Sequence, residues 1–155
     1  MTLGVAVIGA GTVGGGVVKT LLENRDVLAR NAGVDVRLTH VCELDPHALD
    51  AFDLRNVTVT PDVSKICKAK DVQVVCELIG GLEPAKTFIL EALNAGKHVV
   101  TANKMLLATY GPELAKAAQD NKVELRYEAA VAGGIPIIKA LREGLAANRI
   151  KFIYG

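Results

Sequence analysis

Three glycines near the N-terminus have the spacing of a phosphate-binding loop. Gly9, Gly11 and Gly14 form a G-x-G-x-x-G pattern that follows an apolar run, residues 3–8, and precedes a helical pattern. In such a loop the first glycine permits a tight turn, the second lets the backbone approach a pyrophosphate, and the third lets the helix pack closely on the sheet. The helix N-terminus then offers free N–H groups to the phosphates. The pattern predicts a dinucleotide site, with an ordinary strand–turn–helix loop as the alternative.

Two more glycines follow inside the first turn of the expected helix. Gly15 and Gly16 each cost about 1 kcal/mol of helix stability relative to alanine. We expect close approach by a ligand or by a strand to explain both residues.

An acidic side chain narrows the choice of dinucleotide. Glu43 stands at the carboxyl end of the second expected strand, residues 34–42, where NAD-binding folds place the acceptor for the adenosine ribose hydroxyls. Asp45 is a near alternative, and a solvated loop carboxylate is the reading without function. Neither Arg nor Lys lies between Glu43 and Leu54, so a 2′-phosphate would have no nearby cation. NAD is therefore favoured over NADP.

Two later strand ends also carry residues that suit a binding site. Gly80 and Gly81 follow the expected strand 72–76, and Thr101 to Lys104 follow residues 98–101. Carboxyl ends of parallel strands meet at the ligand-binding edge of a sheet. A simple tight turn explains the two glycines equally well, and we expect His98 to be structural.

Strand and helix patterns alternate along the chain. We expect strands at 3–8, 34–42, 56–60, 72–76, 98–101 and 123–127, helices at 13–30, 84–95, 112–121 and 136–147, and a helical turn at 46–49. Asp62 could cap a short helix that runs through Cys67. This rhythm predicts an α/β fold, a Rossmann-type doubly wound parallel sheet in three layers, α/β/α.

The character of the chain changes after Tyr127. We expect residues 1–130 to form an NAD(P)-binding Rossmann domain, and residues 131–155 to contain a helix and the first strand of a further part of the protein. That strand pattern, residues 150–154, begins just as the sequence ends, which suggests a truncated protein.

Composition excludes several classes of function. The 155 residues carry a formal net charge of +1 and are half hydrophobic, so neither nucleic acid nor a membrane surface is an expected partner. No apolar run approaches the ~20 residues of a membrane span. Three cysteines without a C-x-x-C pair favour a reducing, cytoplasmic location.

Together the motifs resemble a known family. Their order is Gly9-Ala10-Gly11-Thr12-Val13-Gly14, Glu77-Leu78-Ile79-Gly80-Gly81, Thr101-Ala102-Asn103-Lys104 and Glu128-Ala129-Ala130-Val131-Ala132-Gly133-Gly134-Ile135-Pro136-Ile137-Ile138. This series is similar to the N-terminal nucleotide-binding region of homoserine dehydrogenases over essentially the whole chain. The family interconverts L-homoserine and L-aspartate 4-semialdehyde with NAD(P), in the synthesis of threonine, methionine and isoleucine.

The resemblance implies roles for individual residues. The pyrophosphate would be contacted by Gly9, Gly11, Thr12, Val13 and Gly14. The nicotinamide ribose would be flanked by Leu78, Ile79 and Gly80. The nicotinamide itself would lie beside Thr101, Asn103 and Lys104. Lys104 is also the candidate for a catalytic role in proton transfer, with a solvated lysine at a helix start as the alternative.

A monovalent cation, sodium, is implied as well. The carboxylate of Glu128 and the backbone carbonyls of Val131, Gly133 and Ile135 would be its ligands. Hard oxygen donors suit such a cation, and its role would be to fix the hinge between two domains.

The chain departs from the family pattern in two respects. Leu44 stands where family members often place an Arg that meets the NADP phosphate, which again favours NAD. By the resemblance, residues 131–155 would form a hinge, a helix and the first strand leading into a substrate and dimerisation domain, which is expected to begin near Gly155 and is missing from this sequence. The full-length protein implied by the resemblance binds a small-molecule substrate and is a homo-oligomer.

The sequence also leaves two other functions as alternatives. Another dehydrogenase of aspartate-derived metabolism, such as aspartate-semialdehyde dehydrogenase, needs a catalytic cysteine, whereas Cys42, Cys67 and Cys76 occupy structural positions without a paired histidine. A non-catalytic NAD-sensing module would bind the cofactor and expose no apolar face, whereas a truncated enzyme would leave a sticky surface.

Overall fold

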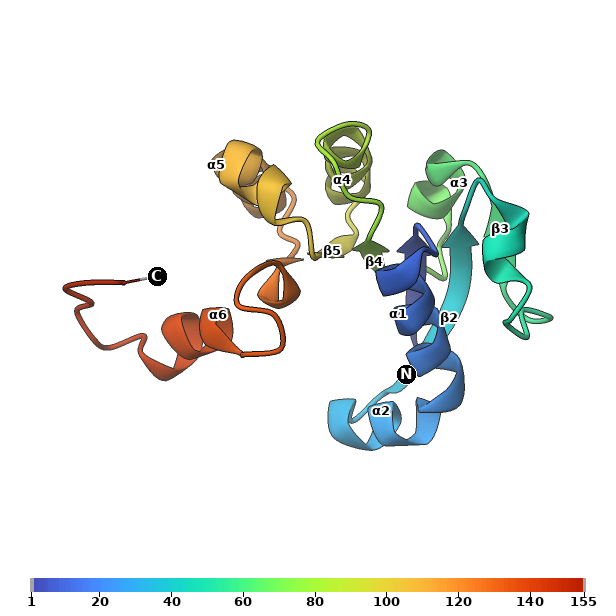
Figure 1. The fold of residues 1–155 in the computed structure, drawn as a ribbon, viewed down its shortest axis with the longest axis horizontal. Coiled ribbons are helices and arrows are strands. Elements are labelled where there is room, and N and C mark those ends of the chain that lie inside the picture. The colour runs from blue at the N-terminus through green and yellow to red at the C-terminus, as the bar shows by residue number, and fades with distance from the viewer. Residues whose placement is uncertain (1, 155) are drawn as a thin grey trace.

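A six-stranded parallel sheet forms the middle layer of the molecule. The computed structural model describes residues 2–154, and its strands follow the order β3-β2-β1-β4-β5-β6 (Figure 1). The bounds are β1 (Thr2–Ile8), β2 (Asp35–Cys42), β3 (Thr58–Thr60), β4 (Val74–Glu77), β5 (His98–Thr101) and β6 (Leu125–Arg126). The strand order reverses between β1 and β4, which creates the switch point where open α/β sheets bind ligands. The doubly wound parallel fold is confirmed.

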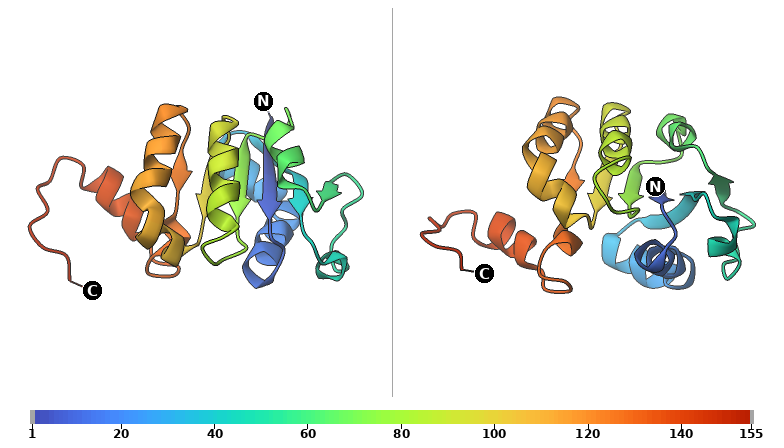
Figure 2. Two further views of the ribbon diagram at one scale, coloured as in Figure 1. Left: turned by 90° about the horizontal axis from the view of Figure 1, so that it is seen from above. Right: turned by 45° about the horizontal axis from the view of Figure 1, so that its top comes forward.

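Helices cover both faces of the sheet. The bounds are α1 (Thr12–Glu23), α2 (Arg25–Ala32), α3 (Val63–Lys68), α4 (Ala85–Asn94), α5 (Lys104–Asp120) and α6 (Ile137–Lys139), with shorter segments η1 (Pro46–Leu49), η2 (Glu128–Ala130) and η3 (Ala140–Gly144). Helices α3, α4 and α5 lie on one face, and α1 and α2 lie on the other (Figures 1 and 2). This arrangement gives the expected three layers.

Strand β1 is buried on both faces. Ala6 and Ile8 pack in the core beneath α3, α4 and α5, whereas Val5 and Val7 pack in the core beneath α1. A near-continuous apolar run is typical of such a central parallel strand. The strand therefore holds the glycine loop, which follows Ile8, against a rigid support.

The helix expected over residues 13–30 is two helices. The chain breaks at Asn24, which ends α1 and begins α2. Arg25 then reaches Asp35 at the start of β2, with 2.9 Å between Nε and Oδ1. This ion pair accompanies the change of direction at Asn24. The amphipathic spacing of residues 13–30 gave no sign of the break.

Helix α5 begins earlier than the sequence suggested. The Oδ1 atom of Asn103 accepts a hydrogen bond from the N–H of Leu106 at 3.1 Å and so caps the helix at Lys104. The expected start, Pro112, lies inside the helix. Proline suits a first turn, but here the cap at Asn103 sets the start eight residues earlier.

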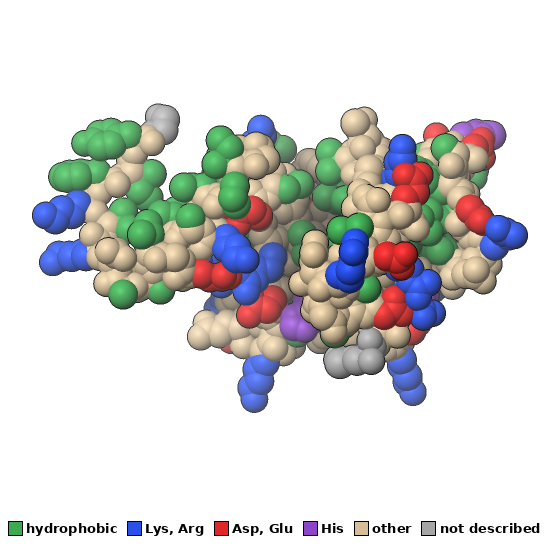
Figure 3. Space-filling model, turned by 90° about the horizontal axis from the view of Figure 1, so that it is seen from below, with side chains coloured by type: hydrophobic (Ala, Val, Ile, Leu, Met, Phe, Trp, Pro, Cys, Tyr) green, Lys and Arg blue, Asp and Glu red, His purple; other side chains and the backbone are tan. Residues whose placement is uncertain are grey.

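The strand expected at residues 150–154 is not formed. Residues 151–154 have no regular secondary structure, and the side chains of Phe152, Ile153 and Tyr154 are 73%, 74% and 90% exposed. A strand needs a neighbour for its backbone hydrogen bonds, and the described part of the chain supplies none there. Figure 3 shows apolar side chains gathered on the projecting C-terminal arm.

The helix expected at 136–147 is shortened to α6 and η3. Ala130 is the last buried hydrophobic residue. The division into residues 1–130 and 131–155 stays a prediction, and its last residue, Gly155, lies outside the described residues. Among residues 2–154, no helix combines the length and the apolar character that a membrane crossing requires.

Candidate functional site

Two glycines of the loop are required by the protein's own packing. Gly9 has φ +88°, and a Cβ atom there would lie 2.6 Å from Cγ2 of Ile79. A Cβ on Gly14 would lie 1.8 Å from the carbonyl oxygen of Gly9. The first residue therefore makes the turn, and the third lets α1 approach that turn closely.

Gly11 is different, because the described protein leaves space around it. A Cβ on Gly11 would meet nothing within 4 Å, and its φ of −63° is open to any residue. No side chain caps α1 at this position, and Thr12 and Val13 at the first turn are exposed. Free N–H groups at a helix N-terminus in front of an open space suit an anion. The protein's packing explains Gly9 and Gly14 but not Gly11, whose surroundings leave room for a ligand.

The next two glycines differ from each other. A Cβ on Gly15 would lie 3.2 Å from the carbonyl oxygen of Ala10 and 3.5 Å from the ring of Phe52, so close packing accounts for this residue. A Cβ on Gly16 would meet nothing within 4 Å. Neither glycine is approached by a strand, so that part of the expectation is wrong, and close approach by a ligand stays a prediction.

A cavity of about 430 Å³ opens beside the loop at the carboxyl ends of β1, β2 and β4. Its lining is mainly apolar and includes Leu44, Pro61, Leu78, Pro84 and Phe88 beside Gly9 and Gly11. Glu43 is the one charged residue among the lining residues, and no Lys or Arg is among them. A flat, weakly polar group such as an adenine fits this lining, with a carboxylate at its edge.

The carboxylate of Glu43 is fixed by the backbone. Oε2 accepts the N–H of Ala10 at 2.6 Å, and Oε1 accepts the N–H groups of Leu44 at 2.8 Å and Asp45 at 3.1 Å. Partial burial raises the pKa of Glu43, but these three donors outweigh it and hold the pKa below its ordinary value. With two lone-pair sites on each oxygen, one site on Oε2 stays open for a hydroxyl donor.

A second, smaller cavity of about 160 Å³ lies on the other side of the same loop. Leu78, Ile79 and Gly80 line both cavities. The second cavity is completed by Val13, Glu77, Ala102 and Asn103. The structure therefore brings the glycine loop and the motifs after β4 and β5 to one edge of the sheet.

Four of the expected residues line neither cavity: Thr12, Gly14, Thr101 and Lys104. Thr101 is fully buried behind the second cavity, and Lys104 is exposed at the first residue of α5 without lining either cavity. The Asn103 side chain caps α5 and donates to the carbonyl of Gly81, so it joins the two loops.

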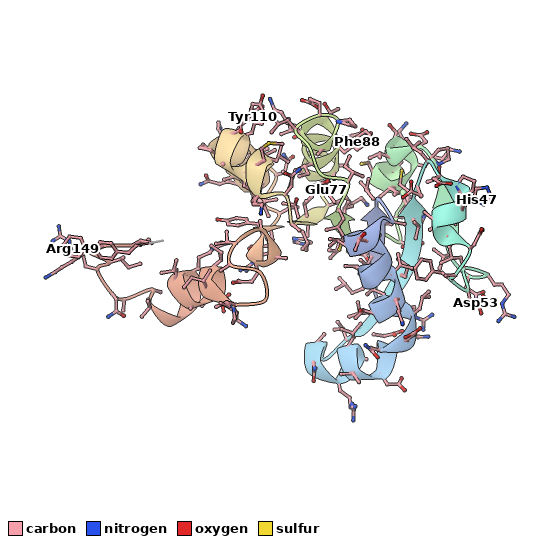
Figure 4. The ribbon with its side chains drawn as sticks, in the orientation of Figure 1. His47, Asp53, Glu77, Phe88, Tyr110 and Arg149 are labelled. Carbon is pink, nitrogen blue, oxygen red and sulfur yellow. The ribbon has the colours of Figure 1, made fainter. Side chains whose placement is uncertain are left out.

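Glu77 is a functional candidate to which the sequence gave no role. It is the last residue of β4, it has no exposed surface, and it lies on the wall of the second cavity. Figure 4 shows it near the centre of the molecule. A carboxylate that ends an otherwise apolar strand was the available signal, the same one that singled out Glu43.

The loop after β6 has a distinctive backbone. Ala132, Gly133 and Gly134 all have positive φ, and both oxygens of Glu128 accept N–H groups at 2.8 Å, from Ile138 and Lys139 at the start of α6. Of the four expected cation ligands, Glu128 and Ile135 line a common cavity of about 200 Å³, whereas Val131 and Gly133 do not line it. Residues 2–154 contain no group of three His, Cys, Asp or Glu side chains placed to hold a metal. The expected cation site would consist mostly of backbone carbonyls, so this finding about side chains does not test it.

The histidine and cysteine interpretations are confirmed. Nδ1 of His98 accepts the N–H of Glu124 at 3.0 Å, so this histidine braces β5. Burial raises the pKa of Cys42, Cys67 and Cys76 to about 11 in each case. Such thiols are protonated at neutral pH and are poor nucleophiles, which disfavours a dehydrogenase that depends on a catalytic cysteine.

Comparison with known proteins is consistent with this geometry. A sequence model described as "Homoserine dehydrogenase, NAD binding domain" matches residues 9–128. The homoserine dehydrogenase of Neisseria gonorrhoeae is 46% identical over 151 residues, which cover 97% of this chain and 34% of that protein. The Bacillus subtilis homoserine dehydrogenase is 42% identical with similar coverage, 97% and 35%.

A solved structure gives the same result. The crystal structure of a homoserine dehydrogenase from Thiobacillus denitrificans superposes with a TM-score of 0.89 at 44% identity, over 97% of this chain and 35% of that one. The chain thus spans about a third of the length of these relatives.

Proposed function

This chain belongs to the homoserine dehydrogenase family and carries its NAD-binding domain, and we propose that it is the cofactor-binding part of an enzyme that interconverts L-homoserine and L-aspartate 4-semialdehyde. The observation that carries this proposal is the open space at Gly11 in front of the uncapped N-terminus of α1. A pyrophosphate bound there would join groups in the two cavities.

The topology supports placing one half of the cofactor in each cavity. The first cavity, which opens at the carboxyl ends of β1, β2 and β4 beside Glu43, would hold the adenosine. The second, which lies at the carboxyl ends of β4 and β5, would hold the nicotinamide. When bound, the nicotinamide supplies the hydride chemistry. The described residues would bind and orient the cofactor. The N-terminus of α1 would contact the pyrophosphate, Glu43 would contact the adenosine ribose, and Leu78 to Gly80 would lie between the two halves.

NAD is the proposed cofactor in preference to NADP. The open acceptor site of Glu43 suits a ribose hydroxyl, whereas a 2′-phosphate would face this carboxylate. Leu44 is 81% exposed at the place where a cation would be needed. Repulsion between Glu43 and a 2′-phosphate, with no cation nearby to offset it, would disfavour NADP relative to NAD.

Titration of NAD+ and NADP+ into the chain tests the proposed function. Calorimetry is expected to show saturable binding of NAD+ and at least about tenfold weaker binding of NADP+. This factor corresponds to the repulsion between one pair of like charges at the surface. Failure to bind either dinucleotide would refute the function. Tighter binding of NADP+ would refute only the role given to Glu43.

Lys104 is proposed to border the reacting centre in the longer enzyme. It begins α5 next to Asn103, which lines the second cavity, and an ammonium near a substrate oxygen would stabilise developing negative charge. In a homoserine dehydrogenase that includes this chain, K104A is expected to lower kcat by at least about a hundredfold. Unchanged turnover would show that Lys104 is only a solvated lysine.

The loop after β6 is proposed to bind sodium. Glu128 and the carbonyls of Val131, Gly133 and Ile135 provide oxygen donors of the right chemistry, and Glu128 already ties this loop to α6. Thermal unfolding in sodium chloride, compared with choline chloride at equal ionic strength, tests the site: equal unfolding midpoints would refute the sodium site.

A cytoplasmic location, an oligomeric enzyme and a role in amino-acid synthesis stay predictions from the family resemblance.

A further inference from the structure

Glu77 is a buried carboxylate whose two partners are uncharged. Oε1 accepts the N–H of Ile79 at 2.9 Å, and Oε2 accepts the hydroxyl of Thr101 at 2.8 Å. The side chain has no exposed surface. Burial of a carboxylate without a cation is unfavourable, so its presence at a binding edge calls for a function.

The N-terminus of helix α5 lies close to the carboxylate of Glu77. Thr101 Oγ1 accepts the N–H of Asn103 at 3.1 Å, and Asn103 is the N-cap of the 17-residue helix α5. The positive end of the α5 dipole thus lies just beyond the hydroxyl that donates to Glu77. The Glu77 carboxylate and the N-terminus of α5 therefore lie together beside the second cavity.

We propose that Glu77 determines which oxidation state of the cofactor this domain prefers. The second cavity, by the proposed function, receives the nicotinamide, which is a cation in NAD+ and uncharged in NADH. A fixed negative charge on the cavity wall attracts the cation and has little effect on the neutral ring. Glu77 therefore favours NAD+ over NADH, in addition to bracing the loops that follow β4 and β5.

The substitution E77Q tests the charge while keeping the shape of the side chain. The dissociation constants of NAD+ and NADH are measured for each variant, by calorimetry and by the fluorescence of NADH. We expect E77Q to weaken NAD+ binding about tenfold, as removal of one charge at short range implies, and to change NADH binding by less than about threefold. Equal weakening of both ligands would show that Glu77 is only a structural brace and would overturn the proposal.

Glu43 provides the matched control, because E43Q removes the same charge from the other cavity. We expect it to weaken NAD+ and NADH by the same factor, since the adenosine half is identical in both. A change in the NAD+/NADH ratio as large as that of E77Q would also overturn the proposal, because the effect would then not be local to the second cavity.

A measurement on the unaltered chain covers the case in which E77Q does not fold. NAD+ is compared with its benzamide analogue, in which a planar uncharged ring replaces the pyridinium, and with ADP-ribose. We expect NAD+ to bind about tenfold more tightly than the benzamide analogue. Equal affinity of these two overturns the proposal for Glu77 alone. Lack of binding of all three ligands overturns the proposed function and this proposal with it.

Discussion

Replacement of Gly14 with alanine is expected to lower the free energy of unfolding by more than about 3 kcal/mol, the range of severe overpacking against a rigid neighbour. The added Cβ would lie 1.8 Å from the carbonyl oxygen and 2.8 Å from the carbonyl carbon of Gly9. Both atoms are backbone, so no side-chain rotation relieves the clash. Either α1 moves off the sheet, with loss of the packing of Val18 and Leu21, or the turn at Gly9 opens. Denaturant unfolding followed by circular dichroism measures the change.

Gly16 supplies the control on the same helix. An alanine there meets nothing within 4 Å, so G16A is expected to leave stability unchanged or to raise it by up to about 1 kcal/mol through the better helix propensity. If G14A proved as stable as G16A, the close approach of α1 to the Gly9 turn would be refuted.

The parts of this fold that could be predicted from sequence are those set by local spacing. The glycine loop, the strand ends at Glu43 and Thr101, and the cap at Asp62 depend on residues a few positions apart, and the structure confirms them. A buried parallel strand also leaves an unambiguous apolar run. The gathering of the site motifs at one edge of the sheet followed from these elements, because parallel strands fix which ends lie together.

Apart from the start of α5, which a local cap at Asn103 sets, the parts that failed depend on residues distant in sequence. The break at Asn24 accompanies the ion pair from Arg25 to Asp35, ten residues away. The network around Glu77 needs Thr101, which is 24 residues away. The expected strand at 150–154 had a suitable pattern but has no neighbouring strand in the described structure. Periodicity reports which faces of an element are apolar and says nothing of the partner that meets them.

Replacement of Gly11 with alanine is expected to abolish cofactor binding without harm to the fold. Its φ of −63° suits an L-residue, and the added Cβ would meet nothing within 4 Å, so the free energy of unfolding should change by less than about 0.5 kcal/mol. The methyl group would occupy the space in front of the α1 N–H groups. Loss of two hydrogen bonds to a charged pyrophosphate corresponds to at least about a hundredfold weaker binding.

The ligands chosen separate this effect from that of Glu77. The pyrophosphate is common to NAD+, NADH and ADP-ribose, so G11A should weaken all three by the same factor, whereas E77Q should act mainly on NAD+. Retention of wild-type affinity by a folded G11A chain would show that no ligand approaches this backbone closely. Unfolding of G11A would show instead that Gly11, like Gly14, serves the protein's own packing. Only loss of binding in a stable chain supports the assignment of this glycine to the cofactor.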